Sequence, residues 1–273
     1  MWKKIFYTAI KRNGWKQLFF YLSNLDVVRF IEFTKAREFL DGEHNIVLEL
    51  GCGYSIFPAL ISGTCKNYIC LDLSKGACKY QSSIPNVSPI MADMRYLPFK
   101  DDVMDNILAI SSIEHVPEDR LVIKEIFRIS KNSAEIIISV PYADRVEMKK
   151  MERSKFLLNI LYKYKKLWKM ILGEHLNYFI EQTSTDSFMK RYNLEEINML
   201  IESESNNFYV ENYYLYEKFF IKIFFKIVPV GWFVLKDMII GWILWKIEDK
   251  IDLKNSGGII FRVKHIVMDD ETT

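Results

Sequence analysis

Several kinds of protein are excluded by what this 273-residue sequence has little of. Its four cysteines crowd between Cys52 and Cys78 without a CxxC pair or neighbouring histidines, which argues against a disulfide framework and a zinc site. We therefore expect reduced thiols, an intracellular protein and no bound metal. Its 37 Lys and Arg residues nearly balance 35 Asp and Glu residues, so the net charge of +2 offers no bulk attraction for nucleic acid.

Long hydrophobic runs are also lacking. In the most apolar stretch, from Phe219 to Lys246, the longest uncharged runs are Ile227 to Leu235 and Met238 to Trp245. A helix needs about 20 predominantly apolar residues to span a bilayer, so a transmembrane helix is not expected. The first apolar stretch is broken by Lys11 and Arg12, which argues against a signal peptide or an anchor. These features favour a cytoplasmic protein.

Hydrophobic residues make up 50% of the chain, and many of them lie in short runs that alternate with helical segments. This alternation predicts an α/β fold, in which helices cover both faces of a parallel sheet. One helix is expected to begin near Pro117, with Val122, Ile126 and Ile129 on one face. The apolar runs are Asn45 to Leu50, Asn67 to Leu71, Met104 to Ile110 and Ala134 to Val140.

The flanking regions are predicted to be mostly helical. An N-terminal helical segment covers residues 1–43, and one elaborated domain covers 44–273, with helical insertions on the acceptor side at 143–206 and 215–257. No internal repeat or flexible linker divides that domain. Four further elements are expected: a long basic helix from Val146 to Leu172, a helix announced by Asn193 and Glu196, and late strands from Asn207 to Tyr214 and from Gly258 to Ile266.

The most informative segment is the glycine loop Gly51-Cys52-Gly53, which follows the first apolar run. Glycine has no Cβ, so a ligand can touch the backbone there, and a nucleotide-like ligand is indicated. The third glycine of the dinucleotide fingerprint is replaced by Ile56, and the acidic Glu49 precedes the loop. A pyrophosphate has no favourable electrostatic interaction with this carboxylate, whereas a ligand with an ammonium group or a cationic centre is attracted to it.

Two more acids follow the next strands. Asp72 is the last residue of the second strand, where a carboxylate can accept hydrogen bonds from both hydroxyls of a ribose. Asp93, within Met91-Ala-Asp-Met94, follows the third strand and can accept a hydrogen bond from an adenine amino group. Each acid has a structural alternative, because Glu49 could be a buried carboxylate bound by backbone amides and the others could be turn or cap residues. Their occurrence together favours the ligand interpretation.

With Leu97-Pro-Phe99 and Ser111-Ser-Ile-Glu-His-Val116, these motifs resemble the class I S-adenosylmethionine-dependent methyltransferases of the type 11 group over about residues 40–142. The resemblance implies a Rossmann-like seven-stranded sheet of order 3-2-1-4-5-7-6, with the last strand antiparallel, and S-adenosyl-L-methionine as the cofactor. It also implies roles along the cofactor: Glu49, Gly51 and Gly53 for the methionyl part, Asp72 for the ribose, Leu73 and Met94 beside the adenine, Asp93 for its amino group, and Ser111 at the reactive end. Tyr54 departs from the family, where a further glycine is common.

The resemblance implies in-line transfer of a methyl group from a sulfonium to an acceptor, with positioning and water exclusion contributing to the rate. Two histidines, His115 and His175, are candidates for proton removal or acceptor binding, since histidine titrates near neutral pH. Tyr142 and Arg191 are further pocket candidates, whereas His44 and His265 are expected to be structural.

The predicted basic helix is amphipathic. Such a segment is typical of contact with an anionic membrane surface or a phosphorylated substrate, although a solvated lysine face over a core-facing stripe has the same pattern. Together with the stretch Phe219 to Trp245, it favours a small-molecule, glycan-precursor or lipid-linked acceptor and peripheral contact with the inner face of the membrane. Its basic residues are Lys149, Lys150, Arg153, Lys155, Lys163, Lys165, Lys166 and Lys169.

Two other functions remain open. The chain could be a catalytically inactive, cofactor-binding interaction module, although the three acids Glu49, Asp72 and Asp93 argue against it. It could also be a nucleic-acid methyltransferase using the basic helix. The balanced charge argues against that alternative, as does Ser111-Ser-Ile-Glu where an Asn-Pro-Pro-Tyr type motif would lie. No nucleic-acid partner is therefore expected.

Overall fold

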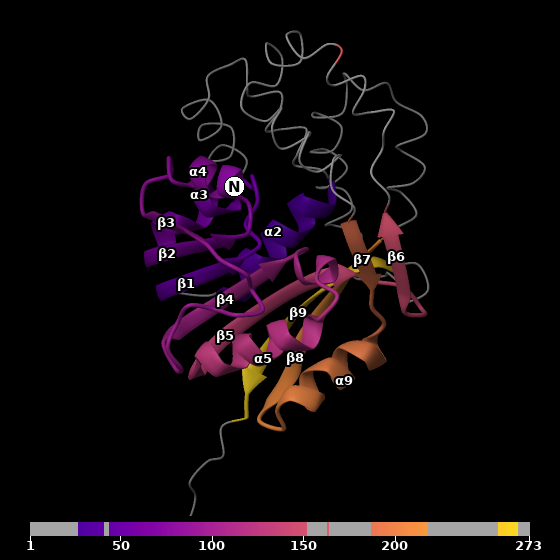
Figure 1. Ribbon diagram of the computed structural model, residues 1–273. Helices are drawn as coiled ribbons and strands as arrows, with labels where there is room; N and C mark the ends of the chain where they lie inside the picture. The colour runs from indigo at the N-terminus through magenta and orange to yellow at the C-terminus, as the bar shows by residue number, and fades with distance from the viewer. Residues whose placement is uncertain (1–26, 41–43, 152–162, 164–186, 218–255, 267–273) are drawn as a thin grey trace, which may run out of the picture.

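The computed structural model describes residues 27–40, 44–151, 163, 187–217 and 256–266, which surround a seven-stranded sheet (Figure 1). The strand order is β3-β2-β1-β4-β5-β9-β8, and β9 runs antiparallel to both of its neighbours. The predicted order and the two late strands are therefore confirmed. The strands are β1 His44–Leu50, β2 Cys65–Asp72, β3 Val87–Met91, β4 Met104–Ile110, β5 Ser130–Pro141, β8 Phe208–Glu217 and β9 Ser256–His265.

The central strands are buried on both faces, which explains their continuous apolar sequences. In β1, Val47 joins one hydrophobic cluster and Leu48 joins the other, and both side chains are fully buried. One face of the sheet is covered by α2 Val27–Phe39, α3 Phe57–Ile61 and α4 Lys75–Gln81, and the other by α5 Asp119–Ile129 and α9 Leu194–Glu204.

The helices confirm several details of the sequence pattern. In α5 the three apolar residues that were expected to share a face, Val122, Ile126 and Ile129, are all buried against the sheet. Helix α9 begins as predicted, since the Asn193 side chain accepts a hydrogen bond of 2.7 Å from the Glu196 amide. Helix α2 ends at Phe39, close to the predicted boundary of the N-terminal helical segment.

The prediction of one long helix from Val146 is wrong at its beginning. Residues Glu147–Met151 form strand β6, which pairs antiparallel with β7, Ser187–Arg191, in a separate two-stranded sheet. Five residues are too few for periodicity to distinguish a helix from a strand, and pairing with a distant segment decides the outcome here. The rest of that predicted helix, His175 and the stretch 219–245 lie outside the described residues. Among the helices that the structure describes, none has the length and hydrophobicity needed to cross a bilayer.

The carboxyl ends of β1 to β5 meet at one edge of the sheet, because these strands pair in parallel. The chain crosses from one side of β1 to the other between β3 and β4, so this edge has a topological switch point beside β1. Ligands of open α/β sheets bind at such a point, outside the carboxyl ends of the strands.

Candidate functional site

The glycine loop at the end of β1 needs both of its glycines. Gly51 has φ +70° and Gly53 has φ +50°, values that side chains other than glycine rarely adopt. A Cβ built on Gly51 would lie 2.5 Å from the Cβ of Ser112, so the loop passes directly against the second residue after the end of β4. A Cβ built on Gly53 would have no neighbouring atom within 4 Å. The backbone at Gly53 therefore leaves room that a ligand can use.

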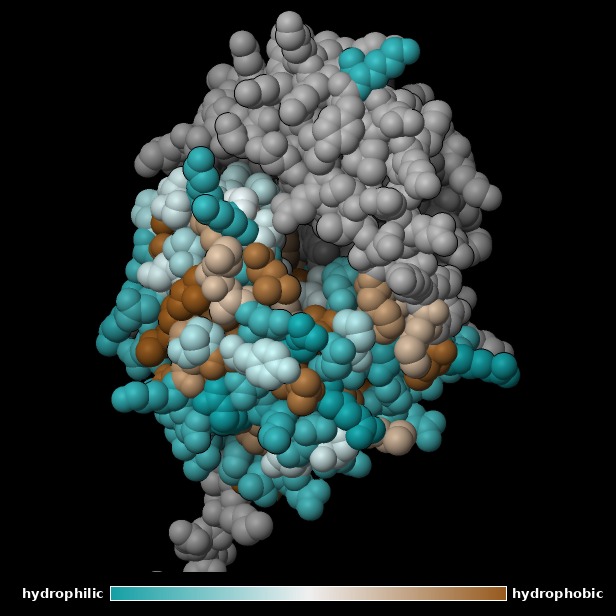
Figure 2. All heavy atoms as spheres, in the orientation of Figure 1, coloured by the Kyte–Doolittle hydropathy of each residue, from teal (hydrophilic) through white to brown (hydrophobic). Residues whose placement is uncertain are grey.

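Asp72, the last residue of β2, ties this loop in place. One carboxylate oxygen accepts a 2.8 Å hydrogen bond from the Gly53 amide, and the other accepts one of 2.8 Å from the Ser74 amide. The expected turn role and the expected ribose role are compatible, because each carboxylate oxygen can accept more than one hydrogen bond. The next residue, Leu73, is 68% exposed. Figure 2 shows hydrophobic side chains among hydrophilic ones on the face of the molecule that it draws.

Glu49 lies buried one residue before the end of β1. Its carboxylate accepts a 2.8 Å hydrogen bond from the hydroxyl of Tyr68. Burial, together with the neighbouring Glu49 carboxylate, raises the pKa of Tyr68 well above its ordinary value, so this hydroxyl stays protonated and donates. The thiols nearby are free, and the hydrogen bond with Cys70 together with burial raises the pKa of Cys52. The Tyr68 hydroxyl and the Cys52 thiol near Glu49 are therefore both neutral.

Asp93 follows β3 and is held by its neighbour Arg95. The Asp93 carboxylate accepts hydrogen bonds of 2.9 Å from the Arg95 amide and 2.7 Å from its guanidinium, which lower the pKa of Asp93. Arg95 is held in turn by Glu118, at 2.7 Å. Beside this acid, the Cε atom of Met94 reaches within 3.3 Å of the Cβ built on Gly51. The segment after β3 therefore lies against the glycine loop.

Gln81, in α4, is a site residue that the sequence did not reveal. Its side chain is fully buried, and its Nε2 donates hydrogen bonds of 2.9 Å to the carbonyl oxygens of both Gly53 and Ser55. The side-chain amide of Gln81 thus holds two backbone carbonyl groups of the glycine loop and fixes the shape of the loop. A glutamine at a buried helix position has no distinctive spacing, so the sequence carried no signal for it.

Tyr54, the departure from the family pattern, packs over the start of α4. Its side chain is 9% exposed, and a Cβ built on Gly76 would lie 2.2 Å from its hydroxyl oxygen. The tyrosine therefore occupies the space that a side chain at position 76 would need.

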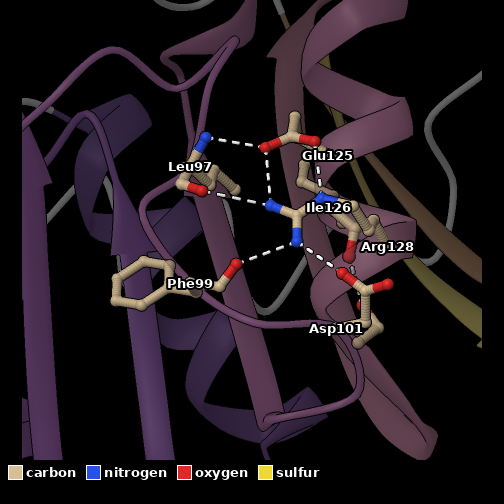
Figure 3. Close-up of polar contacts among 7 residues, drawn as sticks. Leu97, Phe99, Asp101, Glu125, Ile126 and Arg128 are labelled. Carbon is tan, nitrogen blue, oxygen red and sulfur yellow. Dashed lines mark hydrogen bonds and ion pairs between the residues drawn. The ribbon is translucent and has the colours of Figure 1, made fainter.

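The loop between β3 and β4 is fixed by an ion pair on α5 (Figure 3). Arg128 donates to the carbonyl oxygens of Phe99, at 2.8 Å, and Leu97, at 3.1 Å, and Glu125 accepts from the Leu97 amide at 2.7 Å. Arg128 also contacts Glu125 and Asp101 at 2.7 Å each. This brace gives the Leu97-Pro-Phe99 segment a structural role, since it fixes the segment that carries Asp93 and Met94.

Ser111, directly after β4, has the strained φ of +45°. Its amide donates to the carbonyl and hydroxyl oxygens of Ser139, at 3.0 and 2.9 Å, and its hydroxyl donates to Glu32 at 2.6 Å. Glu32 comes from α2, far away in the sequence, and no motif pointed to it.

His115, in the 3-10 turn Ile113–His115, contacts strand β7. Its Nδ1 lies 3.0 Å from the carbonyl oxygen of Phe188 in β7, so this nitrogen must carry a proton and donate. The side chain is 48% exposed. His115 therefore contacts β7 through Nδ1, and its other ring nitrogen, Nε2, lies 3.9 Å from the Glu114 carboxylate.

A buried polar cluster fixes β7 to the helices. Lys190 lies 2.8 Å from Asp119 and 2.6 Å from Glu196, and the Tyr192 hydroxyl donates to Asp119 at 3.0 Å. Burial lowers the pKa of Lys190, but the two carboxylates outweigh it and the net shift is upward. Sequence reasoning missed these residues because they come together only in the folded chain.

The remaining candidates are placed as follows. Tyr142 is buried in the core with Tyr192, and its expected role in a pocket stays a prediction. Arg191 ends β7 opposite Glu147. The two histidines expected to be structural pack within the sheet: Asn106 donates to the His44 ring at 3.0 Å, and the His265 ring meets Phe208 edge-on at 5.0 Å.

Comparisons with known proteins agree with this geometry. The family model of a methyltransferase domain, type 11, matches residues 48–138. An uncharacterized protein of Methanocaldococcus jannaschii is 33% identical over 108 residues, which are 40% of this chain and 46% of the relative. A probable S-adenosylmethionine-dependent methyltransferase of Mycobacterium tuberculosis is 28% identical over 96 residues, 35% of each chain. This chain thus matches less than half the length of these relatives.

A solved structure shows the same fold. The S-adenosylmethionine-dependent methyltransferase from Mesorhizobium loti superposes with a TM-score of 0.53 at 9% identity, over 85% of this chain and 97% of that one. The family match, the sheet order and the placing of the acids at the switch point agree with one another. The domain matched by residues 48–138 is a class I S-adenosylmethionine-dependent methyltransferase domain of the type 11 group, a family whose cofactor is S-adenosylmethionine.

Proposed function

We propose that this chain transfers a methyl group from S-adenosylmethionine to a small-molecule, glycan-precursor or lipid-like acceptor. One observation carries the proposal: Glu49, Asp72 and Asp93 stand at the carboxyl ends of three neighbouring parallel strands, around a glycine loop whose backbone is open at Gly53. This arrangement suits an elongated ligand that has a cationic end, a ribose and an adenine.

The residues present fit such a cofactor. Glu49 would accept a hydrogen bond from the ammonium group of the methionyl part, since its carboxylate is buried near the end of β1, just before the glycine loop. Asp72 would accept from the ribose hydroxyls while still holding the Gly53 amide. Leu73 and Met94 would flank the adenine, and Asp93 would accept from its amino group. The bound cofactor supplies an electrophilic methyl group on a sulfonium.

The protein's part in the reaction is to place the acceptor in line with that methyl group and to exclude water. Ser111 would face the reactive end, because it adjoins Ser112, the residue in contact with the glycine loop. His115 is the described residue best placed to bind the acceptor or remove its proton, since it joins the end of β4 to β7. We propose the same role for His175.

The acceptor class rests on the sequence between β6 and β7. These two strands begin and end a segment rich in lysine, and β7 is fixed beside His115 and α5. A basic amphipathic segment at this place supports an acceptor with phosphate groups or a lipid anchor, and peripheral contact with an anionic membrane.

Calorimetric titration with S-adenosylmethionine tests the proposal. The wild type should bind it, and Asp72→Asn should weaken binding by about 1.5 to 3 kcal/mol, the range for hydrogen bonds to a charged group. Asp105→Asn is the matched control, since Asp105 also accepts a backbone amide, from Ile46 at 3.0 Å, but lies near the amino end of β4.

Two results would contradict the proposal: tighter binding of NADH than of S-adenosylmethionine, or equal affinity in a folded Asp72→Asn variant. Incubation of the wild type with methyl-labelled cofactor and fractionated cell extract then identifies the acceptor. Cofactor binding without any labelled product would favour the inactive interaction module.

A further inference from the structure

The hydroxyl of Ser112 is buried beside the glycine loop and is not satisfied by the protein. Ser112 directly precedes the 3-10 turn Ile113–His115, and the residue is only 6% exposed. Its Oγ has no hydrogen-bond partner in the part of the chain that the structure describes. Leaving a buried hydroxyl without a partner costs free energy, so the presence of a serine here needs an explanation.

Two other buried serines, both in β5, show how such a hydroxyl is ordinarily satisfied. Ser130 donates to the carbonyl oxygen of Ile126 at 2.5 Å, and Ser139 donates to Glu32 at 2.9 Å. Packing alone does not explain a hydroxyl at position 112, because an alanine would keep the Cβ that lies against the glycine loop and would bury no polar atom. The hydroxyl of Ser112 is thus available to a ligand.

The contacts of Gly51 place this hydroxyl within the proposed cofactor site. A Cβ built on Gly51 would lie 3.3 Å from Oγ of Ser112 and also 3.3 Å from Cε of Met94, so both atoms lie beside the same point of the loop. Gly51 is proposed to carry the methionyl part of the cofactor, and Met94 is proposed to flank the adenine. The end of a methionine side chain is flexible and can move aside when a ligand enters.

We infer that Ser112 donates a hydrogen bond to the carboxylate of the cofactor's methionyl part, and that it thereby makes the site select ligands that carry this group. This inference rests on the proposed function. Glu49 is proposed to accept from the ammonium group of the same amino acid. The ligand's carboxylate is bonded to the same carbon atom as that ammonium group, and it needs a donor rather than a second carboxylate. A hydrogen bond to an ionised carboxylate is roughly twice as strong as one between neutral groups.

The experiment is calorimetric titration of S-adenosylmethionine and of its decarboxylated analogue, which keeps the sulfonium and the ammonium group. The wild type should bind the complete cofactor more tightly. Ser112→Ala should weaken binding of S-adenosylmethionine on the order of tenfold and change that of the analogue by less than about twofold, because only the first ligand loses a hydrogen bond. Ser130→Ala is the matched control, since Ser130 is an equally buried serine near the amino end of β5, and it should leave both affinities unchanged.

Urea unfolding without ligand gives a second measurement that a structural role would change. Ser112→Ala should keep or raise the midpoint of unfolding, because the hydroxyl that is lost has no partner. Ser130→Ala should lower the midpoint, because the carbonyl of Ile126 loses its donor. The two serines should therefore behave in opposite ways in binding and in stability.

The outcomes separate this inference from the proposed function. If Ser112→Ala weakens both ligands equally, or neither, or if the wild type binds both ligands equally, the inference is wrong and the proposed function stands. A midpoint that falls as far as in Ser130→Ala, or the loss of a cooperative transition, also overturns the inference, since the hydroxyl would then stabilise the fold. If the wild type binds neither ligand, both proposals fail.

Discussion

Alanine substitutions at Gly51 and Gly53 should separate the stability of the glycine loop from its capacity to bind the cofactor. Both glycines have positive φ, at +70° and +50°, so each substitution imposes a similar backbone strain of about 1 to 2 kcal/mol. Their surroundings differ. A methyl group at position 51 would lie 2.5 Å from the Cβ of Ser112, whereas one at position 53 would meet no atom within 4 Å.

The two variants should therefore differ in stability. Gly51→Ala adds the strain of an overpacked contact, about 1 to 3 kcal/mol, to the backbone cost, because Ser112 follows the strained Ser111 and has little freedom to move away. Its free energy of unfolding should fall by about 2 to 5 kcal/mol in total. Gly53→Ala should lose only the backbone share, about 1 to 2 kcal/mol.

In cofactor binding, by contrast, Gly53→Ala should show a large direct effect although it is the more stable of the two variants. The space beside Gly53 is open to a ligand, so a methyl group there should lower the affinity for S-adenosylmethionine at least tenfold, which corresponds to a loss of about 1.4 kcal/mol in binding free energy. Most of the Gly53→Ala protein should stay folded. Urea unfolding and calorimetric titration of both variants measure the two effects. Unchanged affinity in Gly53→Ala would refute the placing of the cofactor on this loop. Equal stability of the two variants would refute the close contact between Gly51 and Ser112.

Four more predictions concern the parts around the loop. Gln81→Leu removes both hydrogen bonds to the loop carbonyls and should lower the free energy of unfolding by about 2 kcal/mol and also weaken cofactor binding; unchanged affinity in calorimetry would show that the brace does not matter for binding. Arg95→Met should reduce stability at neutral pH but not in acid. The reason is that Arg95 lowers the pKa of Asp93. The Asp93–Arg95 pair therefore contributes to the free energy of unfolding above the ordinary carboxyl pKa of about 4, and this contribution is lost as the pH falls through the lowered pKa. Urea unfolding that shows the same difference between Arg95→Met and the wild type at pH 7 and at pH 2 would contradict this. Residues 143–273 expressed alone should show no cooperative transition in scanning calorimetry, because β8 and β9 complete a sheet whose other strands come from residues 44–141. Neutralising Lys163, Lys165, Lys166 and Lys169 together should release the protein from anionic vesicles without changing its affinity for the cofactor. Each lysine contributes about 1 kcal/mol of binding free energy near an anionic surface. A wild type that does not cosediment with such vesicles at low salt would rule out membrane contact.

The parts of the fold that could be predicted are those set by local sequence. Strand β1 is a largely apolar run that ends at Leu50, directly before Gly51, and α9 begins at the Asn193 cap, so both follow from short-range rules. The sheet order followed from the family resemblance. Strand β6 could not be predicted, because five residues carry too little periodicity and their partner, β7, comes 35 residues after β6 ends.

The site shows the same division. Glu49, Asp72 and Asp93 stand where the motifs place them, although their roles toward the cofactor remain predictions. Gln81 and Glu32 could not be foreseen, because each reaches the site from a helix whose packing is decided by tertiary structure.

The position of β9 has a consequence for how the protein is made. Strand β8 pairs with β9, and β9 alone joins it to β5, yet β9 is synthesised 38 residues after β8 ends. Until β9 leaves the ribosome, β5 has an unpaired edge that includes Ile136, Ile137 and Ile138, and β8 has no partner in the sheet. An exposed apolar edge is a site for mispairing with other chains. Nascent chains stalled before residue 256 should therefore depend on chaperones, whereas released full-length chains, in which β9 can pair, should not.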